Sequence, residues 1–438
     1  MWSFLDSILL AFQFLAANSA QSKYKEMSLR SILILLKLPF DLLVVILRFY
    51  IFGGLRFRRY NRELRNCLRL RIYRAALAVD ILDGKLIGPH SNAFLIRKVI
   101  PYILSTLVEN CPGYGKRFDP QSFWLVKQND RKPSDPVIIF SHGGGYYIQT
   151  MPSQIQSLLS IYQLLDEDVQ KRTSILFLDY KLVSDGYPFP TQLHQLDETY
   201  NKLLDEGNEN IILMGDSAGG HLSVAYTVFL KLLEKSVIYP SKLVLISPWV
   251  KLSPLPSDAQ KGYSWHENED RDLITYHRFS SVQDLKHIIG FQDPFSLLCS
   301  PGGKTPRSRD DWASIPNFSD PNHDVFLIFG EDESFRDDIV QWASYALNYP
   351  VGDEYGAFAT SADDSKYSFI RHGEQGNANL TAFVEPMGVH DAMLYFEHDI
   401  AKIIEKAHSL GEKLAIADVD QSKFFGITRL TNFFNDTL

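Results

Sequence analysis

From about residue 115 onward, short apolar runs alternate regularly with longer helix-like stretches. The runs are rich in β-branched and aromatic residues, and several are continuous, as expected of strands that are covered on both faces. They occupy residues 121–128, 136–142, 174–182, 210–215, 242–250, 324–330 and 381–386. Helical patterns separate most of them, at residues 153–171, 191–206, 217–235, 335–347 and 392–414. This alternation predicts an α/β fold with a mostly parallel central sheet flanked by helices.

Two long intervals interrupt the alternation. Residues 251–320 hold many Ser, Pro, Asp and Gly residues between two predicted strands, and residues 351–378 are polar. Loops of this length are uncommon in compact domains unless they are functional or disordered. We therefore expect the first interval to form a lid or pocket wall and the second to be a surface insertion. The length of 438 residues suits one large domain with such additions.

The sequence Gly-Asp-Ser-Ala-Gly at residues 215–219 stands where a predicted strand passes into a predicted helix. A G-x-S-x-G turn needs small residues beside the serine, because the serine occupies a tight, strained turn above the sheet. The pattern alone is weak, but a strand before it and a helix after it are the context in which it presents a nucleophile. Ser217 is therefore the candidate nucleophile, and the N–H of Ala218 is a candidate oxyanion donor.

A second glycine-rich motif, His-Gly-Gly-Gly-Tyr-Tyr at residues 142–147, follows another predicted strand. Glycines leave backbone N–H groups uncovered, so these groups can point at a developing oxyanion and stabilise its charge. Gly143 and Gly144 are the candidate donors. The alternative interpretation is a plain glycine-rich β-turn. His142 precedes the donors, and we expect it to pack within the loop and not to act as a base.

Together with the segment DYKLVSDGYPFP at residues 179–190, these motifs resemble the hormone-sensitive-lipase-like branch of the α/β hydrolases. The resemblance runs from about residue 120 to residue 415. The apolar N-terminus and the segment SPWVKLSP at residues 247–254 are similar to a fungal group that includes the membrane-bound steryl acetyl hydrolase. The resemblance implies an α/β-hydrolase fold, ester hydrolysis and a triad in the order Ser, acid, His. Val-Ser-Asp at residues 183–185 departs from the Ala-Pro-Glu that is usual in this branch.

The same resemblance locates the remaining two triad members. The acid of this branch stands three positions before an Arg-Asp pair, which here is Glu333, where the branch more usually has Asp. Asp332 is the alternative. His390 follows a predicted strand and precedes a helix, which is the position of the catalytic histidine in this branch. A neutral imidazole there can take the proton of Ser217, while Glu333 fixes its tautomer and stabilises the imidazolium.

Three functions are compatible with such a site: ester hydrolysis, acyl transfer to an alcohol, and ligand binding by a receptor without catalysis. We favour hydrolysis, and the resemblance implies short acyl chains on a large hydrophobic alcohol, with acetylated sterols as the leading candidate. Tyr146, Tyr147 and Trp249 are candidate walls of an apolar pocket, or else core aromatics. The sequence contains no metal-ligand spacing, dinucleotide fingerprint, phosphate loop or nucleic-acid-binding module, so no metal, cofactor or nucleic acid is expected.

The N-terminal part differs from the rest in composition. Residues 2–17 and 31–55 are apolar, and eight arginines lie within residues 56–74. Residues 1–80 hold 13 Lys or Arg and 5 Asp or Glu, a net charge of +8, whereas the remaining 358 residues sum to −16. An apolar and basic segment of this kind favours association with an anionic membrane. We expect residues 1–75 to be membrane-associating and residues 76–438 to form the catalytic domain.

How this segment meets the membrane stays open at the level of sequence. Residues 31–55 are long enough to span a bilayer, but Lys37, Asp41 and Arg48 within them make spanning costly. The alternatives are a helix in the membrane interface and a buried helix on the catalytic domain. The fungal resemblance implies the membrane of the endoplasmic reticulum. The arginines favour a cytosolic catalytic domain, whereas the resembling group suggests a lumenal one.

Overall fold

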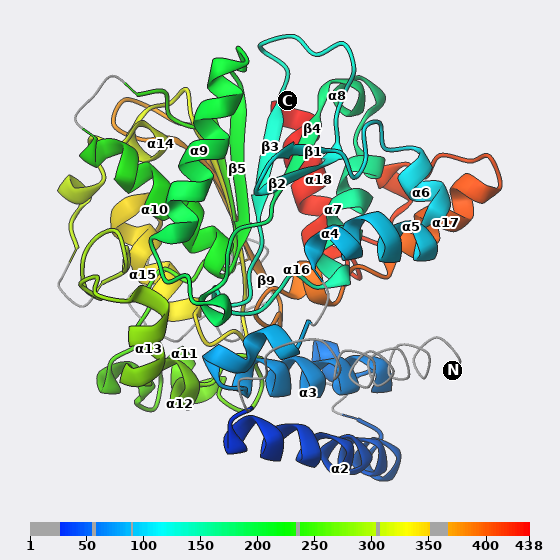
Figure 1. The fold of residues 1–438 in the computed structure, drawn as a ribbon, viewed down its shortest axis with the longest axis vertical. Coiled ribbons are helices and arrows are strands. Elements are labelled where there is room, and N and C mark those ends of the chain that lie inside the picture. The colour runs from blue at the N-terminus through cyan, green and yellow to red at the C-terminus, as the bar shows by residue number, and fades with distance from the viewer. Residues whose placement is uncertain (1–26, 55–57, 89–90, 234–236, 304–306, 351–366) are drawn as a thin grey trace.

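A nine-stranded sheet forms the centre of the protein, in the order β1-β2-β4-β3-β5-β6-β7-β9-β8 (Figure 1). The computed structural model describes residues 27–54, 58–88, 91–233, 237–303, 307–350 and 367–438. The strands are β1 (Arg117–Asp119), β2 (Ser122–Val126), β3 (Val137–Ser141), β4 (Ser174–Leu178), β5 (Ile211–Asp216), β6 (Lys242–Ile246), β7 (Asp324–Gly330), β8 (Ser368–Arg371) and β9 (Asn379–Glu385). From β4 to β9 along the sheet neighbours are parallel, and the edge strands β1, β2 and β8 are antiparallel. The predicted mostly parallel sheet is therefore confirmed.

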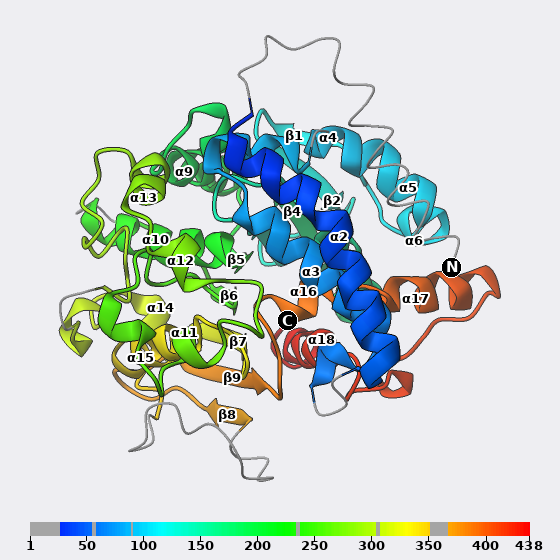
Figure 2. The ribbon, with the colours of Figure 1, turned by 90° about the horizontal axis from the view of Figure 1, so that it is seen from below.

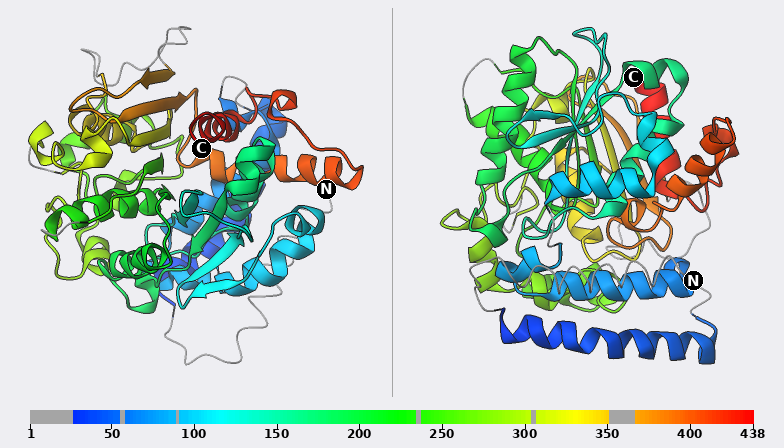
Figure 3. Two further views of the ribbon diagram at one scale, coloured as in Figure 1. Left: turned by 90° about the horizontal axis from the view of Figure 1, so that it is seen from above. Right: turned by 45° about the vertical axis from the view of Figure 1, so that its right-hand side comes forward.

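Helices cover both faces of the sheet (Figures 1 and 3). One face carries α9 (Thr191–Asp205), α10 (Ala218–Leu232) and α15 (Arg336–Ala346), and the other carries α7 (Pro152–Leu164), α17 (Ile400–Ser409) and α18 (Phe425–Thr437). Alternate side chains of β3 enter two separate hydrophobic cores: Val137 and Ile139 join the first, and Ile138 and Phe140 the second. A strand buried on both faces needs an apolar residue at every position, which explains the continuous apolar run. Shorter helices complete the body: α4 (Asn92–Phe94), α5 (Ile100–Ile103), α6 (Ser105–Glu109), α8 (Glu167–Arg172) and α16 (Ala392–Tyr395).

Two N-terminal helices lie one above the other at one end of the body (Figures 1–3). The outer helix, α2 (Leu29–Phe52), begins after Ser28, whose side chain accepts a hydrogen bond from the N–H of Ser31 at 3.2 Å. It ends at Gly53, which has the left-handed conformation that suits a glycine. The inner helix, α3 (Leu64–Ala78), packs between α2 and the body. Asp41 of α2 forms an ion pair with Arg71 of α3.

The outer face of α2 is apolar and exposed. Leu36, Phe40, Leu43, Leu47 and Ile51 are each more than half exposed, and Ser31 is the one buried residue in this helix. The structure thus differs from the alternative of a buried helix, because α2 contacts mainly α3 and turns its other side outward. Of the helices in the described part of the chain, none is both long enough and apolar enough to cross a membrane. The apolar stretch at residues 2–17 lies outside the described residues.

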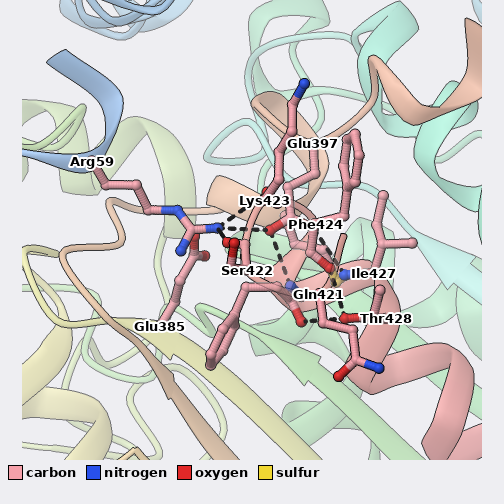
Figure 4. Close-up of polar contacts among 12 residues, drawn as sticks. Arg59, Glu385, Glu397, Gln421, Ser422, Lys423, Phe424, Ile427 and Thr428 are labelled. Atoms are coloured by element: carbon pink, nitrogen blue, oxygen red, sulfur yellow. Dashed lines mark hydrogen bonds and ion pairs between the residues drawn. The ribbon is translucent and has the colours of Figure 1, made fainter. Parts of the chain in front are cut away.

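Arg59 and Tyr60 fix the N-terminal segment to the body. Arg59 Nε lies 3.1 Å from Glu385 Oε1, and its Nη2 donates to the carbonyl oxygen of Ser422 at 2.6 Å (Figure 4). The hydroxyl of Tyr60 donates to the same carboxylate of Glu385. Glu385 is buried at the end of β9, so Arg59 provides the positive charge that its carboxylate needs there.

A second buried carboxylate, Glu397, extends this cluster. Its oxygens accept hydrogen bonds from the N–H groups of Gly426 (3.0 Å) and Ile427 (2.9 Å) at the start of α18. Arg59 Nη2 lies 3.8 Å from Glu397 Oε1. Burial, together with the nearby Glu385, raises the pKa of Glu397 to about 8. Arg59 thus contacts residues that lie more than 300 positions further along the sequence.

The expected division of the chain at residue 75 does not coincide with the packing. Residue 75 lies inside α3. Ion pairs hold both this helix and the segment before it to the body. Arg65 and Arg69 pair with Asp399 at 2.9 Å and 3.1 Å, and Arg58 pairs with Asp332. A division on composition alone misses these contacts, because the arginines that suggest a membrane segment are partly used to bind acidic residues of the body.

The two long intervals have different outcomes. Residues 251–320 form four short helices, α11 (Ser264–Glu267), α12 (Tyr276–Phe279), α13 (Val282–Ile289) and α14 (Pro316–Ser319). The first three lie beside α3 at the same end of the molecule, as a pocket wall would (Figures 1 and 2). Within the second interval, residues 351–366 lie outside the described residues. The described part of this interval contains β8, the edge strand that pairs with β9.

Candidate active site

Ser217 occupies the sharp turn between β5 and α10. Its φ of 50° and ψ of −113° are unusual for a residue with a side chain, and they lift the hydroxyl above the end of the strand. The flanking glycines are required by packing. A Cβ at Gly219 would lie 1.8 Å from the carbonyl oxygen of Ser141, and one at Gly215 would lie 2.3 Å from the backbone of Gly219. The G-x-S-x-G pattern thus reflects the tight contact between this turn and β3.

The structure brings Ser217, His390 and Glu333 together in one chain of contacts. His390 Nε2 lies 2.9 Å from Ser217 Oγ, and His390 Nδ1 lies 3.1 Å from Glu333 Oε1. All three side chains are buried. Asp332, the alternative acid, points elsewhere: its carboxylate pairs with Arg58 and lies 3.3 Å from Arg271 Nη1. Of the two candidate acids, Glu333 is the one that reaches the imidazole.

Two polar residues that the sequence analysis did not identify support this chain. Ser247 Oγ donates to Glu333 Oε2 at 2.8 Å. Asp272 is buried, and its carboxylate accepts hydrogen bonds from the N–H groups of His390 (2.8 Å) and Ser334 (2.7 Å). Asp272 therefore ties together the loops that carry the base and the acid. It belongs to the interval 251–320, where no motif marks it out.

The electrostatic surroundings favour the charged form of the imidazole. Burial lowers the pKa of His390, but the carboxylates of Asp391 and Glu333 outweigh it, and the pKa lies well above the ordinary value of 6.5. Burial raises the pKa of Asp272 to about 6. A histidine in this setting is suited to hold a proton transiently between two oxygen atoms.

The two expected oxyanion donors of the glycine loop behave differently. The N–H of Gly143 donates to Asp216 Oδ1 at 2.9 Å, so it is occupied and the expectation for this residue is not met. Gly144 lines the cavity above Ser217, and its φ of 98° is readily available only to glycine. As the first residue of α10, Ala218 has an N–H without an intrahelical acceptor. Gly144 and Ala218 thus remain the candidate donors.

The three aromatic residues expected in the pocket lie elsewhere. Tyr146 has a φ of 66°, which turns its ring into the core, where the hydroxyl lies 2.6 Å from His221 Nδ1. Tyr147 donates to the carbonyl oxygen of Leu77 at 2.8 Å. Trp249 stacks on Phe335 with ring centroids 6.3 Å apart. None of the three lines the cavity above Ser217. Tyr146 is a core aromatic, whereas Tyr147 and Trp249 line a further small cavity beside α12 and α13.

The cavity above Ser217 is instead walled largely by apolar residues from α3 and neighbouring loops. They are Tyr73, Ala76, Leu77, Ile148, Met151, Leu273 and Tyr395. A second cavity of about 160 Å³ adjoins it and opens between α2, α3 and α12. Leu77 and Leu273 line both cavities and separate them. Among the described residues, no group of three or more His, Cys, Asp or Glu side chains is arranged to hold a metal ion.

A mostly parallel sheet, a serine at the strand–helix turn after β5, and a histidine and an acid supplied by later loops define an α/β hydrolase. Within that class, the profile of the steryl acetyl hydrolase family matches residues 114–349, more than half of the chain. The chain therefore belongs to this family of carboxylic ester hydrolases, and the resemblance seen in the sequence is confirmed.

Two yeast relatives carry the name of the same family. The chain is 33% identical over 245 residues to the mug81 protein of Schizosaccharomyces pombe, which is named as a steryl acetyl hydrolase, and the match covers 53% of this chain and 62% of that protein. It is 30% identical over 120 residues to steryl acetyl hydrolase 1 of Saccharomyces cerevisiae, covering 26% and 27%. In both cases the matched part is less than two thirds of the relative's length. Among solved structures, an esterase of the bacterial hormone-sensitive lipase family is 18% identical with a TM-score of 0.48, covering 84% of this chain and 96% of that chain.

Proposed function

We propose that the protein is a serine carboxylesterase. Ser217 attacks the ester carbonyl while His390 takes its proton, and the N–H groups of Gly144 and Ala218 stabilise the oxyanion. His390 then protonates the leaving alcohol, and water releases the acyl group from Ser217. The observation that carries this proposal is the unbroken chain of contacts from Ser217 through His390 to Glu333.

The substrates we propose are short-acyl esters of hydrophobic alcohols, with acetylated sterols as the leading candidate. The narrow cavity above Ser217 suits a small acyl group. The adjoining cavity between α2, α3 and α12 is the place that we propose for the large alcohol. The names of the two yeast relatives support the same substrate class.

The alternatives use the same scaffold. A receptor without catalysis has no need of a serine, an imidazole and a carboxylate in hydrogen-bonding contact, so that geometry favours an enzyme. Acyl transfer to an alcohol would use the same residues as hydrolysis. Analysis of the products formed from an acetate ester with and without an added alcohol separates these two reactions.

We further propose that the protein binds the membrane of the endoplasmic reticulum through its N-terminal part, with α2 lying in the interface. The exposed apolar face of α2 and the net positive charge of residues 1–80 support binding to an anionic membrane surface. The second cavity opens beside α2, so a substrate dissolved in the membrane would enter close to the lipid. The side of the membrane is a separate question, which glycosylation of Asn435 in the sequon Asn435-Asp436-Thr437 would answer for the lumen.

Replacement of the nucleophile tests the proposed activity. Ser217→Ala should abolish turnover of acetate esters and labelling by a fluorophosphonate, while the protein keeps its thermal unfolding midpoint. Substrates should include esters of acetate, butyrate and palmitate on a small alcohol and on a sterol. Persistent labelling of the Ser217→Ala protein would contradict the assignment, as would a preference for palmitate over acetate for the proposed acyl group.

A further inference from the structure

The residue after the histidine places a second carboxylate at the site. Asp391 has a φ of 51° and a ψ of 30°, a left-handed conformation that is rare for residues with a side chain. As a result, its Oδ2 lies 3.1 Å from His390 Nε2, the same nitrogen that contacts Ser217 Oγ. The N–H of Asp391 donates to Ser247 Oγ at 3.1 Å, and Ser247 in turn contacts Glu333. Ser247 thus helps to position both Asp391 and Glu333.

The other oxygen of Asp391 lacks a partner. Oδ1 is buried and has no hydrogen bond with any residue that the structure describes, and Asp391 is 1% exposed. Asp391 lines the cavity above Ser217, where most of its neighbours are apolar. An unpaired buried carboxylate oxygen is costly, and such atoms in native proteins usually bind a ligand or a water molecule. Asp391 therefore brings a carboxylate with one unpaired oxygen to the wall of this cavity.

The chemistry of the reaction identifies the partner of this acceptor. The ester substrate offers only oxygen acceptors near the scissile bond, and a carboxylate cannot pair with them. The water that attacks the acyl-enzyme has two O–H groups. One must point to His390 Nε2, and the other is then free to donate to Asp391 Oδ1. An attacking alcohol has one O–H, which His390 must take, and it would leave the carboxylate unpaired.

We propose that Asp391 is a positioning residue that holds the hydrolytic water beside His390 and selects water over alcohols as the acyl acceptor. This inference rests on the proposed esterase function. The water oxygen attacks the acyl carbonyl carbon, one water proton passes to His390 Nε2, and the second O–H stays bonded to Asp391 Oδ1. The bond between the acyl carbon and Ser217 Oγ then breaks, the proton on Nε2 passes to Oγ, and the carboxylic acid leaves with the second proton.

The titratable groups that face Asp391 act on its ionisation in opposite directions, because His390 favours the carboxylate and Glu333 disfavours it. They are His390 and Glu333 on one side and Asp216 of β5 on the other. Burial raises the pKa of Asp391 to about 6, although His390 opposes the shift. Burial and Asp391 also raise the pKa of Asp216 well above its ordinary range, while hydrogen bonds from Gln154 and Gly143 hold its side chain. Above about pH 6 the Asp391 carboxylate is available to accept from water.

The test separates acylation from deacylation. Asp391→Ala removes the acceptor, and Asp391→Asn keeps the shape but has one carbonyl oxygen in place of two carboxylate oxygens. In rapid mixing with p-nitrophenyl acetate, Asp391→Ala should keep a burst of p-nitrophenol equal to the enzyme concentration. Its steady-state rate should fall by roughly ten- to a hundredfold, as expected for the loss of one hydrogen bond to a charged group. Asp391→Asn should show a smaller fall in the same direction.

The second readout is the choice of acyl acceptor. With ethanol present, the ratio of ethyl acetate to acetate should rise in both variants, more in Asp391→Ala than in Asp391→Asn. A role confined to the fold or to His390 would slow the burst and the steady state together and leave this ratio unchanged, and that result would overturn the proposal. Unchanged kinetics in Asp391→Asn, the variant least disturbing to the fold, would overturn it equally. If the proposed esterase function itself were wrong, the wild-type protein would release no p-nitrophenol above the Ser217→Ala background.

Discussion

Glu333 is the acid that contacts His390 on the side of the imidazole away from Ser217. Its carboxylate contacts Nδ1 of the imidazole and is itself held by Ser247 Oγ and by the N–H of Gly330, both at 2.8 Å. Glu333→Gln keeps the shape but removes the charge, and kcat should fall by about 10⁴-fold, as in other triads. Asp332→Asn is the matched control, because Asp332 is the adjacent acid and pairs with arginines. A larger loss in the control than in Glu333→Gln would reassign the acid.

The pH dependence of activity follows from the shifted pKa of His390. The base must be neutral to accept the proton of Ser217, and its pKa lies well above 6.5. The acidic limb of kcat/KM should therefore lie at a higher pH than for an ordinary histidine, with activity rising as pH rises. Stability has the opposite sign: the contribution of protonated His390 is complete below its unfolded pKa and is lost as pH rises through its folded pKa. Steady-state kinetics and thermal unfolding across pH measure the two effects, and an acidic limb below pH 6.5 would contradict the first.

Single residues also show what the sequence could and could not predict at the site. Ser217 and His390 stand next to a strand end and a helix start, so motif and context locate them, and the structure places them in contact. Asp272 and Ser247 act through hydrogen bonds across the fold, and no local pattern reveals such partners. The occupied N–H of Gly143 depends on how Asp216 turns its carboxylate, which a row of three glycines cannot indicate.

Among the elements, the wall between the two cavities should determine alcohol specificity. Leu273, in the interval before α12, lines both cavities and is 2% exposed. Leu273→Trp should lower kcat/KM for a sterol acetate by about tenfold or more, because the added volume blocks the path of the large alcohol. Turnover of p-nitrophenyl acetate should stay within a few fold of wild type and reports that the site is intact. Equal losses on both substrates would contradict the proposed path. Leu410→Trp, at an exposed position after α17, is the control.

α3 should behave as part of the catalytic body. A chain that starts at Arg58 keeps α3 and its ion pairs with the body, and it should still hydrolyse small esters. A chain that starts near residue 75 loses Tyr73 and the Arg59 cation that pairs with the buried Glu385 and Glu397, so it should be inactive or unfolded. Arg59→Leu in the full chain isolates this effect and should cost about 3–5 kcal/mol in thermal or denaturant unfolding. Full activity of the chain that starts near residue 75 would show that α3 is dispensable.

The elements themselves were predicted unevenly. All seven strands expected from apolar runs are present, because strands buried on both faces leave a strong signal. β1 has three residues, and β8 is an edge strand in a polar stretch, so neither produces such a run. α2 and α3 were recognised as apolar and basic, but their position over the active site depends on ion pairs with residues far along the chain.

For the whole molecule, the uneven charge and the exposed face of α2 lead to one prediction. The full-length protein should sediment with vesicles that contain anionic lipids, and the chain that starts at Arg58 should stay in the supernatant while it still hydrolyses small esters. Leu36→Gln, Leu43→Gln and Leu47→Gln together test the apolar face without shortening the chain, since all three are more than half exposed. Vesicle binding that is unaffected by these three changes would exclude α2 as the contact. High salt should weaken only the electrostatic part of vesicle binding.

The contacts of Arg59 also bear on the order in which the protein takes shape during synthesis. Arg59 leaves the ribosome more than 300 residues before Glu385, Glu397 and the backbone of Ser422, which it contacts in the folded protein. Until then α3 has no acidic partner at this corner of the molecule, and the histidine beside Ser217 does not yet exist. The attachment of α3 above Ser217 and the addition of His390, the proposed base, therefore take place at the same late stage. A nascent chain arrested before residue 385 would hold an open, inactive serine.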